Sequence, residues 1–211
     1  MKLAVIGATG RTGRHVVTQA LDRGHEVTAV ARRPEQVEIA HERLRVVSAD
    51  ARDRAALRAA VAGSESIVSA VGAASGRAPT DVCSVAVANE LAAMDGDWVR
   101  RLAVISASPV GPREEQPAVA RAVILPILDV FYGGAYEDMR RMEATLSRRD
   151  DLEWACLRPP RLLDRPGTGA YRIDSRPLPQ TRSLTRPDLA LALLDAVSAE
   201  NARTGMLYVA N

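Results

Sequence analysis

The chain has 211 residues, of which 47% are apolar and 26% are charged, and its formal net charge at neutral pH is +2. This length suits one well-buried domain, and so small a net charge gives no electrostatic case for binding nucleic acid or a membrane surface. Aromatic residues make up 3% of the chain, without the basic-aromatic interleaving that stacks bases.

The cysteines and histidines show no pattern that binds a metal. Cys83 and Cys156 stand alone, so we expect buried thiols, and the three histidines are scattered. The chain enters a strand at once, without a charged-then-apolar leader, and no apolar run approaches the ~20 residues of a membrane span. We therefore expect a cytoplasmic protein, a monomer or homodimer, with a small-molecule substrate and no metal.

The first half of the chain alternates apolar, β-branched runs with helical patterns. The run 2–6 predicts a buried strand, and 11–23 carries the apolar stripe of a helix that packs on a sheet. Gly24 and Gly63 follow predicted helices, where glycine commonly ends them. The remaining expected elements of this half are strands at 26–31, 44–49 and 66–71 and a helix at 53–62.

The second half continues the alternation. Thr80 is an expected cap for a helix over 81–94, and 136–148 has an amphipathic helical pattern. A strand at 153–158 should stop at Pro159-Pro160. The other expected elements are strands at 101–106 and 206–210 and a helix at 188–198.

This alternation predicts an α/β fold, a single Rossmann-type doubly wound parallel sheet flanked by helices. We expect residues 1–211 to form one NAD(P)-binding domain. Two irregular stretches, at about 109–135 and 159–185, follow strands whose ends lie at the carboxyl edge of the sheet. Ligands bind at that edge, so these stretches are the expected substrate-side loops.

The first strand-to-helix junction has the chemistry of a phosphate cradle. It reads GATGRTG, with Gly7, Gly10 and Gly13 where a sharp turn, close backbone approach and a helix start are needed. Free amides and the positive helix end there favour an anion. The alternative is a tight turn without a ligand, but a strand before and a helix after favour a dinucleotide. Thr9, Arg11 and Thr12 add potential donors.

The end of the second strand indicates which cofactor is bound. NAD sites usually place an acidic residue there for the ribose 2′-hydroxyl, whereas this chain has Arg32 and Arg33. A guanidinium binds a 2′-phosphate with paired, charge-assisted hydrogen bonds. The pair favours NADP(H) over NAD(H), with a merely solvated arginine pair as the alternative.

These features resemble the atypical short-chain dehydrogenase/reductases, in particular the small NAD(P)H-binding group with the biliverdin reductase B (flavin reductase) and NmrA-like proteins. The likeness covers nearly the whole chain. It is carried by GATGRTG with the arginine pair, SAD (48–50), SAVG (69–72), ISASPVG (105–111), EWACLRPPRLLD (153–164) and LTRPDLALAL (184–193).

The resemblance implies roles for individual positions. The pyrophosphate would be held by Gly7, Thr9, Gly10, Arg11, Thr12 and Gly13, and the 2′-phosphate by Arg32 and Arg33. Asp50 and Ala51 would contact the adenine, and Ala70, Val71 and Gly72 would line the ribose. Ser106, Pro159 and Pro160 would lie near the nicotinamide.

The usual catalytic lysine of short-chain dehydrogenases is missing, because Lys2 in the first strand is the single lysine of the chain. Tyr136 and Arg140, four residues apart on one helix face, are the candidate acid and its electrostatic partner. Tyr132 is a rival acid, and Ser108 is the candidate carbonyl-orienting serine. The alternatives are a surface Tyr-Arg pair and a turn-closing hydroxyl.

Together these residues predict an NADP(H)-dependent reductase that transfers hydride to a small conjugated or carbonyl acceptor. Two alternatives stay open: a non-catalytic NADP(H)-binding redox sensor of the NmrA-like type, and an epimerase- or dehydratase-like enzyme.

Overall fold

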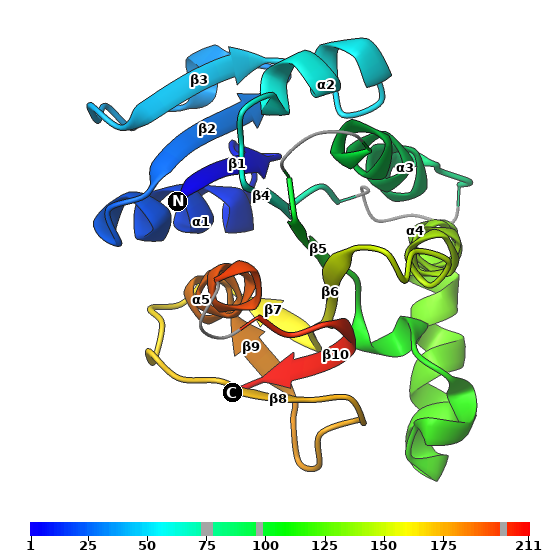
Figure 1. Cartoon of the computed structure of the whole chain (residues 1–211). Coiled ribbons are helices and arrows are strands. Elements are labelled where there is room, and N and C mark those ends of the chain that lie inside the picture. Colours follow the sequence, from blue (N-terminus) through cyan, green and yellow to red (C-terminus); the bar gives the residue numbers. More distant parts are fainter. Residues whose placement is uncertain (73–77, 96–98, 199–201) are drawn as a thin grey trace.

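The computed structural model describes residues 1–72, 78–95, 99–198 and 202–211. Its main sheet has eight strands in the order β3-β2-β1-β4-β5-β6-β10-β8, all parallel except β8 (Figure 1). This contains the 3-2-1-4-5-6 arrangement of dinucleotide-binding sheets. The strands are β1 (Lys2–Ile6), β2 (Glu26–Ala31), β3 (Leu44–Ser48), β4 (Ser66–Ser69), β5 (Arg101–Ile105), β6 (Glu153–Arg158), β8 (Arg172–Asp174) and β10 (Gly205–Ala210).

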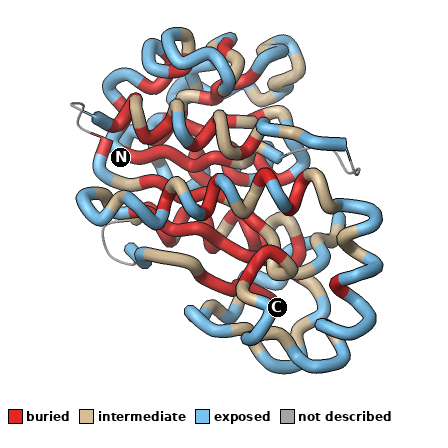
Figure 2. The backbone as a smooth tube through the Cα atoms, turned by 90° about the vertical axis from the view of Figure 1, so that its right-hand side faces the viewer, coloured by how far each residue is buried: buried red, intermediate tan, exposed pale blue. Residues whose placement is uncertain are grey.

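Helices cover both faces of this sheet, which confirms the expected doubly wound fold. The α-helices are α1 (Arg11–Asp22), α2 (Arg54–Val61), α3 (Val82–Met94), α4 (Leu125–Leu146) and α5 (Arg186–Val197). Figure 2 shows buried strands at the centre between more exposed layers. In the part of the chain that the structure describes, no helix is both long and apolar enough to cross a membrane.

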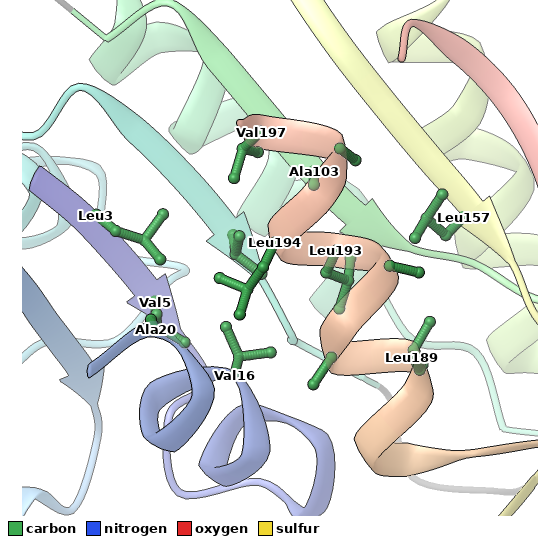
Figure 3. Close-up of a cluster of buried hydrophobic side chains, with 14 of the residues drawn as sticks. Leu3, Val5, Val16, Ala20, Ala103, Leu157, Leu189, Leu193, Leu194 and Val197 are labelled. Atoms are coloured by element: carbon green, nitrogen blue, oxygen red, sulfur yellow. The ribbon is translucent and has the colours of Figure 1, made fainter. Parts of the chain in front are cut away.

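The core divides into two clusters because strand side chains alternate between faces. In β1, Leu3 and Val5 join the cluster beneath α1 and α5, whereas Ala4 and Ile6 join the one beneath α2, α3 and α4. Figure 3 shows Leu3 and Val5 beside Val16 of α1 and the leucines of α5. Cys83 and Cys156 are both buried, as expected.

Helix starts follow local capping rules at two places. The Asp53 carboxylate accepts the amides of Ala55 and Ala56, each at 3.0 Å, at the start of α2. The Thr185 hydroxyl accepts the Asp188 amide at 3.2 Å at the start of α5. The predicted elements agree with the structure within two residues, apart from the helix expected at 136–148.

The cap of α3 matches the expectation only in part. The Thr80 hydroxyl accepts the amide of Val82, the first residue of α3, at 3.4 Å. The N-cap residue itself is Asp81, whose side chain makes no capping hydrogen bond. The next two amides, of Cys83 at 2.7 Å and Ser84 at 3.2 Å, donate to the buried carboxylate of Asp138 in α4. A residue 55 positions away therefore caps this helix, and local sequence cannot reveal such a cap.

The stretch 109–135, expected to be irregular, is largely helical. It contains 3₁₀ turns at Ser108–Val110 and Arg113–Glu115, a π-helical turn at Ala120–Ile124, and the first half of α4. Pro126 lies in the first turn of α4, where a proline's missing N–H costs little. Gly133 and Gly134 lie inside α4 and do not end it, despite their weak helix propensity.

The stretch 159–185 crosses the carboxyl edge of the sheet. It contains β7 (Arg161–Leu163) and β9 (Ser183–Thr185), which form a separate parallel pair, with β8 between them in the chain. A further 3₁₀ turn, Pro34–Gln36, follows β2.

Candidate functional site

The glycine loop connects β1 to α1 and lies against the end of β4. Gly7 has a φ of +76°, the left-handed region that favours glycine. A Cβ on Gly7 would lie 3.0 Å from the carbonyl carbon and oxygen of Ala70. The Ala70 amide donates to the Ile6 carbonyl at 2.8 Å. The structure thus brings the predicted phosphate loop and the predicted ribose loop together.

Gly10 and Gly13 form the start of α1. Gly10 is the N-cap residue of α1, and no side chain caps this helix. The first amides of a helix have no partner within the helix, so they are left to bind another acceptor. A Cβ on Gly13 would lie 2.2 Å from the Gly7 carbonyl oxygen. Glycine at 13 is therefore required for helix and loop to pack. The start of α1, which no side chain caps, fits an anion such as a pyrophosphate.

The predicted ribose loop continues from Ala70 through Val71 and Gly72. Val71 is half-buried against the core, and Gly72 is exposed. A Cβ on Gly72 would meet no atom of the described residues within 4 Å. Thr9 is half-buried and its carbonyl accepts the Arg14 Nε at 3.1 Å.

The ends of β2 and β3 carry the predicted adenosine-side residues. Arg32 and Arg33 follow β2 and are exposed, with no side-chain partner among the described residues. Asp50 follows β3, and its carboxylate accepts the Arg52 amide at 2.9 Å. The Ala51 carbonyl accepts the Asn89 amide group at 2.9 Å. Sequence reasoning missed Asn89 of α3, which holds the loop after β3 that is predicted to contact the adenine.

A second residue of α3 was also missed. Glu90 is fully buried, and its Oε1 accepts the Ser69 hydroxyl at 2.7 Å. Its Oε2 has no hydrogen-bond partner among the described residues. Burial raises the pKa of Glu90 to about 7. An ionisable group of α3 thus contacts Ser69, the residue directly before the predicted ribose loop.

Ser106, predicted to lie near the nicotinamide, belongs to a buried polar network. The Ser106 hydroxyl, 3% exposed, donates to Glu143 Oε1 at 2.7 Å. Arg158 donates to both oxygens of Glu143, at 2.9 and 2.7 Å. The Ser108 amide donates to the Pro159 carbonyl at 2.8 Å, which joins the segments after β5 and β6. Pro160 is half-buried beside them.

The predicted acid Tyr136 is 8% exposed and lies in α4. Burial and the nearby Tyr132 and Asp129 raise its pKa to about 12, and Arg140 opposes this shift without overcoming it. The rings of Tyr132 and Tyr136 stack with centroids 5.7 Å apart. Arg140 itself pairs with Glu137 at 3.3 Å. Tyr136 therefore stays protonated at neutral pH but is a weak acid.

A cavity of about 690 Å³ lies beside this face of α4. Of the predicted catalytic residues, Arg140 lines it, together with Glu143 and Arg158 of the buried network. Tyr136 and Ser108 are not among its lining residues. The full lining is Val110, Gly111, Pro112, Arg113, Glu114, Arg140, Glu143, Ala144, Ser147, Arg158 and Met206.

The last cluster joins the glycine loop to distant segments. Arg11 donates to Asp164 at 2.9 Å, and Asp164 also accepts Arg186 Nε at 2.6 Å. Arg186 Nη1 reaches the hydroxyl of Thr12, which is buried, at 3.3 Å. Asp164 and Arg186 were not predicted as site residues, because each lies more than 150 positions from the loop it contacts.

The NAD(P)H-binding family model matches residues 7–200. The chain belongs to the NAD(P)H-binding family. This membership shows that the family's ligand is a nicotinamide cofactor, and the match covers the glycine loop, the strand ends and the network around Glu143.

Several solved structures share the fold of this chain. An oxidoreductase of Lactococcus lactis covers 100% of this chain, and the match covers 91% of that chain, with a TM-score of 0.83 and 19% identity. An anaerobilin reductase of Escherichia coli O157:H7 has a TM-score of 0.78 at 20% identity, and the match covers 100% of this chain and 97% of that chain. A Streptococcus pneumoniae protein, a candidate NADH-flavin reductase, has a TM-score of 0.73 at 19% identity, with 100% and 99% covered. At these identities the likeness shows the fold.

One curated relative matches a short part of this chain. A 4-hydroxy-tetrahydrodipicolinate reductase of Natronomonas pharaonis is 56% identical over 32 residues, 15% of this chain and 13% of that protein. So short a match carries no information about a shared substrate.

Proposed function

We propose that this protein is an NADP(H)-dependent reductase, which transfers hydride to a small conjugated or carbonyl acceptor in the manner of flavin and biliverdin reductases. The observation that carries the proposal is the convergence of the glycine loop, the ribose loop and the ends of β5 and β6 on one sheet edge. The strand order reverses between β1 and β4, where open α/β sheets bind ligands. Two of the proteins with similar folds are described as reductases, which supports the proposal.

The proposed roles are those that the family resemblance implies. The glycine loop, with Gly7, Thr9, Gly10, Arg11, Thr12 and Gly13, would hold the pyrophosphate, and Arg32 and Arg33 the 2′-phosphate. Asp50 and Ala51 would contact the adenine, and Ala70, Val71 and Gly72 the ribose. Ser106, Pro159 and Pro160 would border the nicotinamide, which supplies a hydride when bound. Ser108 would orient the acceptor.

The proton that accompanies the hydride needs a source within the protein or the solvent. Tyr136 is the proposed donor, because its phenol is protonated at neutral pH; its raised pKa makes it a weaker acid than an ordinary tyrosine. Arg140 would stabilise the phenolate by its charge without relaying a proton, since a guanidinium stays protonated. The acceptor would enter through the cavity that Arg140 borders.

The second candidate is a non-catalytic NADP(H)-binding sensor. The burial of Tyr136 and the lack of a lysine beside it favour this function. The two candidates share cofactor binding and differ in whether an acceptor is reduced.

Two measurements test the proposal. NADPH and NADH are titrated into the purified protein with fluorescence detection, and we expect tighter NADPH binding. NADPH oxidation is then followed with flavins, quinones and bilins as acceptors. Turnover with one of these classes supports the reductase, and tight NADPH binding without any turnover supports the sensor. Tighter binding of NADH would overturn the role of the arginine pair.

A further inference from the structure

Arg186 brings a positive charge from the start of α5 to the glycine loop. Its side chain is 12% exposed. The guanidinium is held at two points, by Asp164 at 2.6 Å through Nε and by the Thr12 hydroxyl at 3.3 Å through Nη1. A planar guanidinium held by two bonds in fixed directions has little freedom to reorient. Arg186 is therefore positioned at the first turn of α1.

Asp164 connects this arginine to a second one. Its other oxygen accepts Arg11 Nη1 at 2.9 Å. The hydrogen bond from Arg186 and the charges of both arginines hold the pKa of Asp164 below its usual value, so the carboxylate is ionised at neutral pH. Two cations and one anion leave a net positive charge of one beside the α1 N-terminus. That charge adds to the positive end of the helix dipole.

The Thr12 hydroxyl links this charge to the site of the ligand. A hydroxyl has one hydrogen to donate and two lone pairs that accept. Because its oxygen accepts from Arg186, its own hydrogen is available for another acceptor. A hydroxyl bonded to a cation is a stronger donor than one bonded to a neutral group. The acceptor expected at this point is an oxygen of the pyrophosphate that the glycine loop is proposed to bind.

We propose that Arg186 is a positioning residue for the cofactor pyrophosphate, which acts through Thr12 and is held in place by Asp164. The ligand class is a nucleoside diphosphate, since the cluster lies at the glycine loop and away from the 2′-phosphate arginines after β2. The inference rests on the proposed pyrophosphate role of the loop and is independent of any preference for NADPH over NADH.

The experiment uses two fragments of the cofactor with the full chain. ADP-ribose carries the pyrophosphate without a 2′-phosphate, and adenosine 2′-monophosphate carries the 2′-phosphate without the pyrophosphate. Dissociation constants are measured by calorimetry for the wild type and for Arg186→Ala. We expect Arg186→Ala to weaken ADP-ribose about tenfold, as for one charge-assisted hydrogen bond, and to leave adenosine 2′-monophosphate unchanged.

Variants separate positioning from folding. Arg32→Ala should show the opposite pattern, weakening adenosine 2′-monophosphate and sparing ADP-ribose. Thr12→Val combined with Arg186→Ala should cost less than the sum of the single losses, because both remove the same contact. Arg186→Lys should restore part of the ADP-ribose affinity. Arg182→Ala, an exposed arginine on the same segment, is the matched control and should bind as the wild type does.

The outcomes distinguish this inference from the proposed function. Wild-type protein that does not bind ADP-ribose overturns the pyrophosphate role of the loop and the inference with it. Wild-type binding that Arg186→Ala leaves unchanged overturns the inference alone. Equal weakening of both fragments by Arg186→Ala, with a lowered thermal midpoint, also overturns it, since that pattern reports a general structural loss.

Discussion

The hydroxyl of Ser69, the last residue of β4, donates a 2.7 Å hydrogen bond to the carboxyl of Glu90 in α3, and both residues are buried. This pair places a titratable group directly before the Ala70–Gly72 loop. The second oxygen of Glu90 has no partner among the described residues, so the protonated form is favoured. Stability and pH are therefore linked at this position.

The pKa of Glu90, raised from 4.5 to about 7, makes the folded protein less stable as pH rises. The folded state binds the proton more tightly than the unfolded state, so the stabilisation is complete below the unfolded pKa. It is lost as pH rises through the folded pKa, by about 3 kcal/mol in all. Urea unfolding at pH 5 and pH 8 measures this change. Glu90→Gln should remove this component, and an unchanged pH dependence in the variant would refute it.

Arg32→Asp should exchange the cofactor preference. A carboxylate repels the 2′-phosphate of NADPH and accepts the ribose 2′-hydroxyl of NADH. We expect NADPH binding to weaken by at least about tenfold while NADH binding holds or improves. Titration of each cofactor gives the result. Arg45→Asp, an exposed arginine on the neighbouring strand β3, is the control. A parallel loss of both cofactors would argue against a 2′-phosphate contact.

Gly13→Ala should disrupt the glycine loop. The added methyl would lie 2.2 Å from the Gly7 carbonyl oxygen, so the loop or α1 must move. We expect a loss of roughly 1–3 kcal/mol in unfolding free energy together with weaker binding of NADPH and NADH. Gly133→Ala is a matched control, because a Cβ there meets no described atom within 4 Å. That variant should be neutral or slightly stabilised, since alanine favours the helix.

Asp138→Ala should destabilise the packing of α3 on α4. The change leaves the amides of Cys83 and Ser84 without the carboxylate that accepts them. We expect a loss of about 3 kcal/mol in unfolding free energy, the cost of buried donors that lose a charged acceptor. Chemical denaturation measures it. Glu137→Ala, on the exposed side of the same helix, should change the stability by less than about 0.5 kcal/mol.

Tyr136→Phe should lower turnover and leave NADPH affinity intact. The phenol, whose pKa is raised to about 12, stays protonated between pH 6 and 9, so this residue should add no inflection to the pH profile there. We expect a fall of about a hundredfold in kcat, typical for loss of a general acid. Tyr132→Phe, which removes the hydroxyl of the rival acid stacked on Tyr136, tests the alternative assignment. Unchanged turnover in Tyr136→Phe would assign the proton to solvent or another group.

The parts of the fold that depend on nearby residues were predictable from sequence. The spacing of Gly7, Gly10 and Gly13 between a strand and a helix predicted the cofactor loop, and the family match covers it. The alternation of strands and helices predicted the parallel sheet. The stretch 109–135 was misread because Pro126 and the Gly133-Gly134 pair suggest a break, whereas Pro126 lies where a helix tolerates it.

The sequence by itself determined the class of fold, the glycine loop, the arginine pair after β2 and the lack of a lysine for the usual catalytic set. Each of these depends on residue type or on spacing within a few positions. The tertiary structure alone decided that Asp138 caps α3, that Glu90 is buried against Ser69, and that Arg186 reaches Thr12. Those contacts join residues 21 to 174 positions apart, and side-chain burial and pairing at such distances are set by how the helices pack on the sheet.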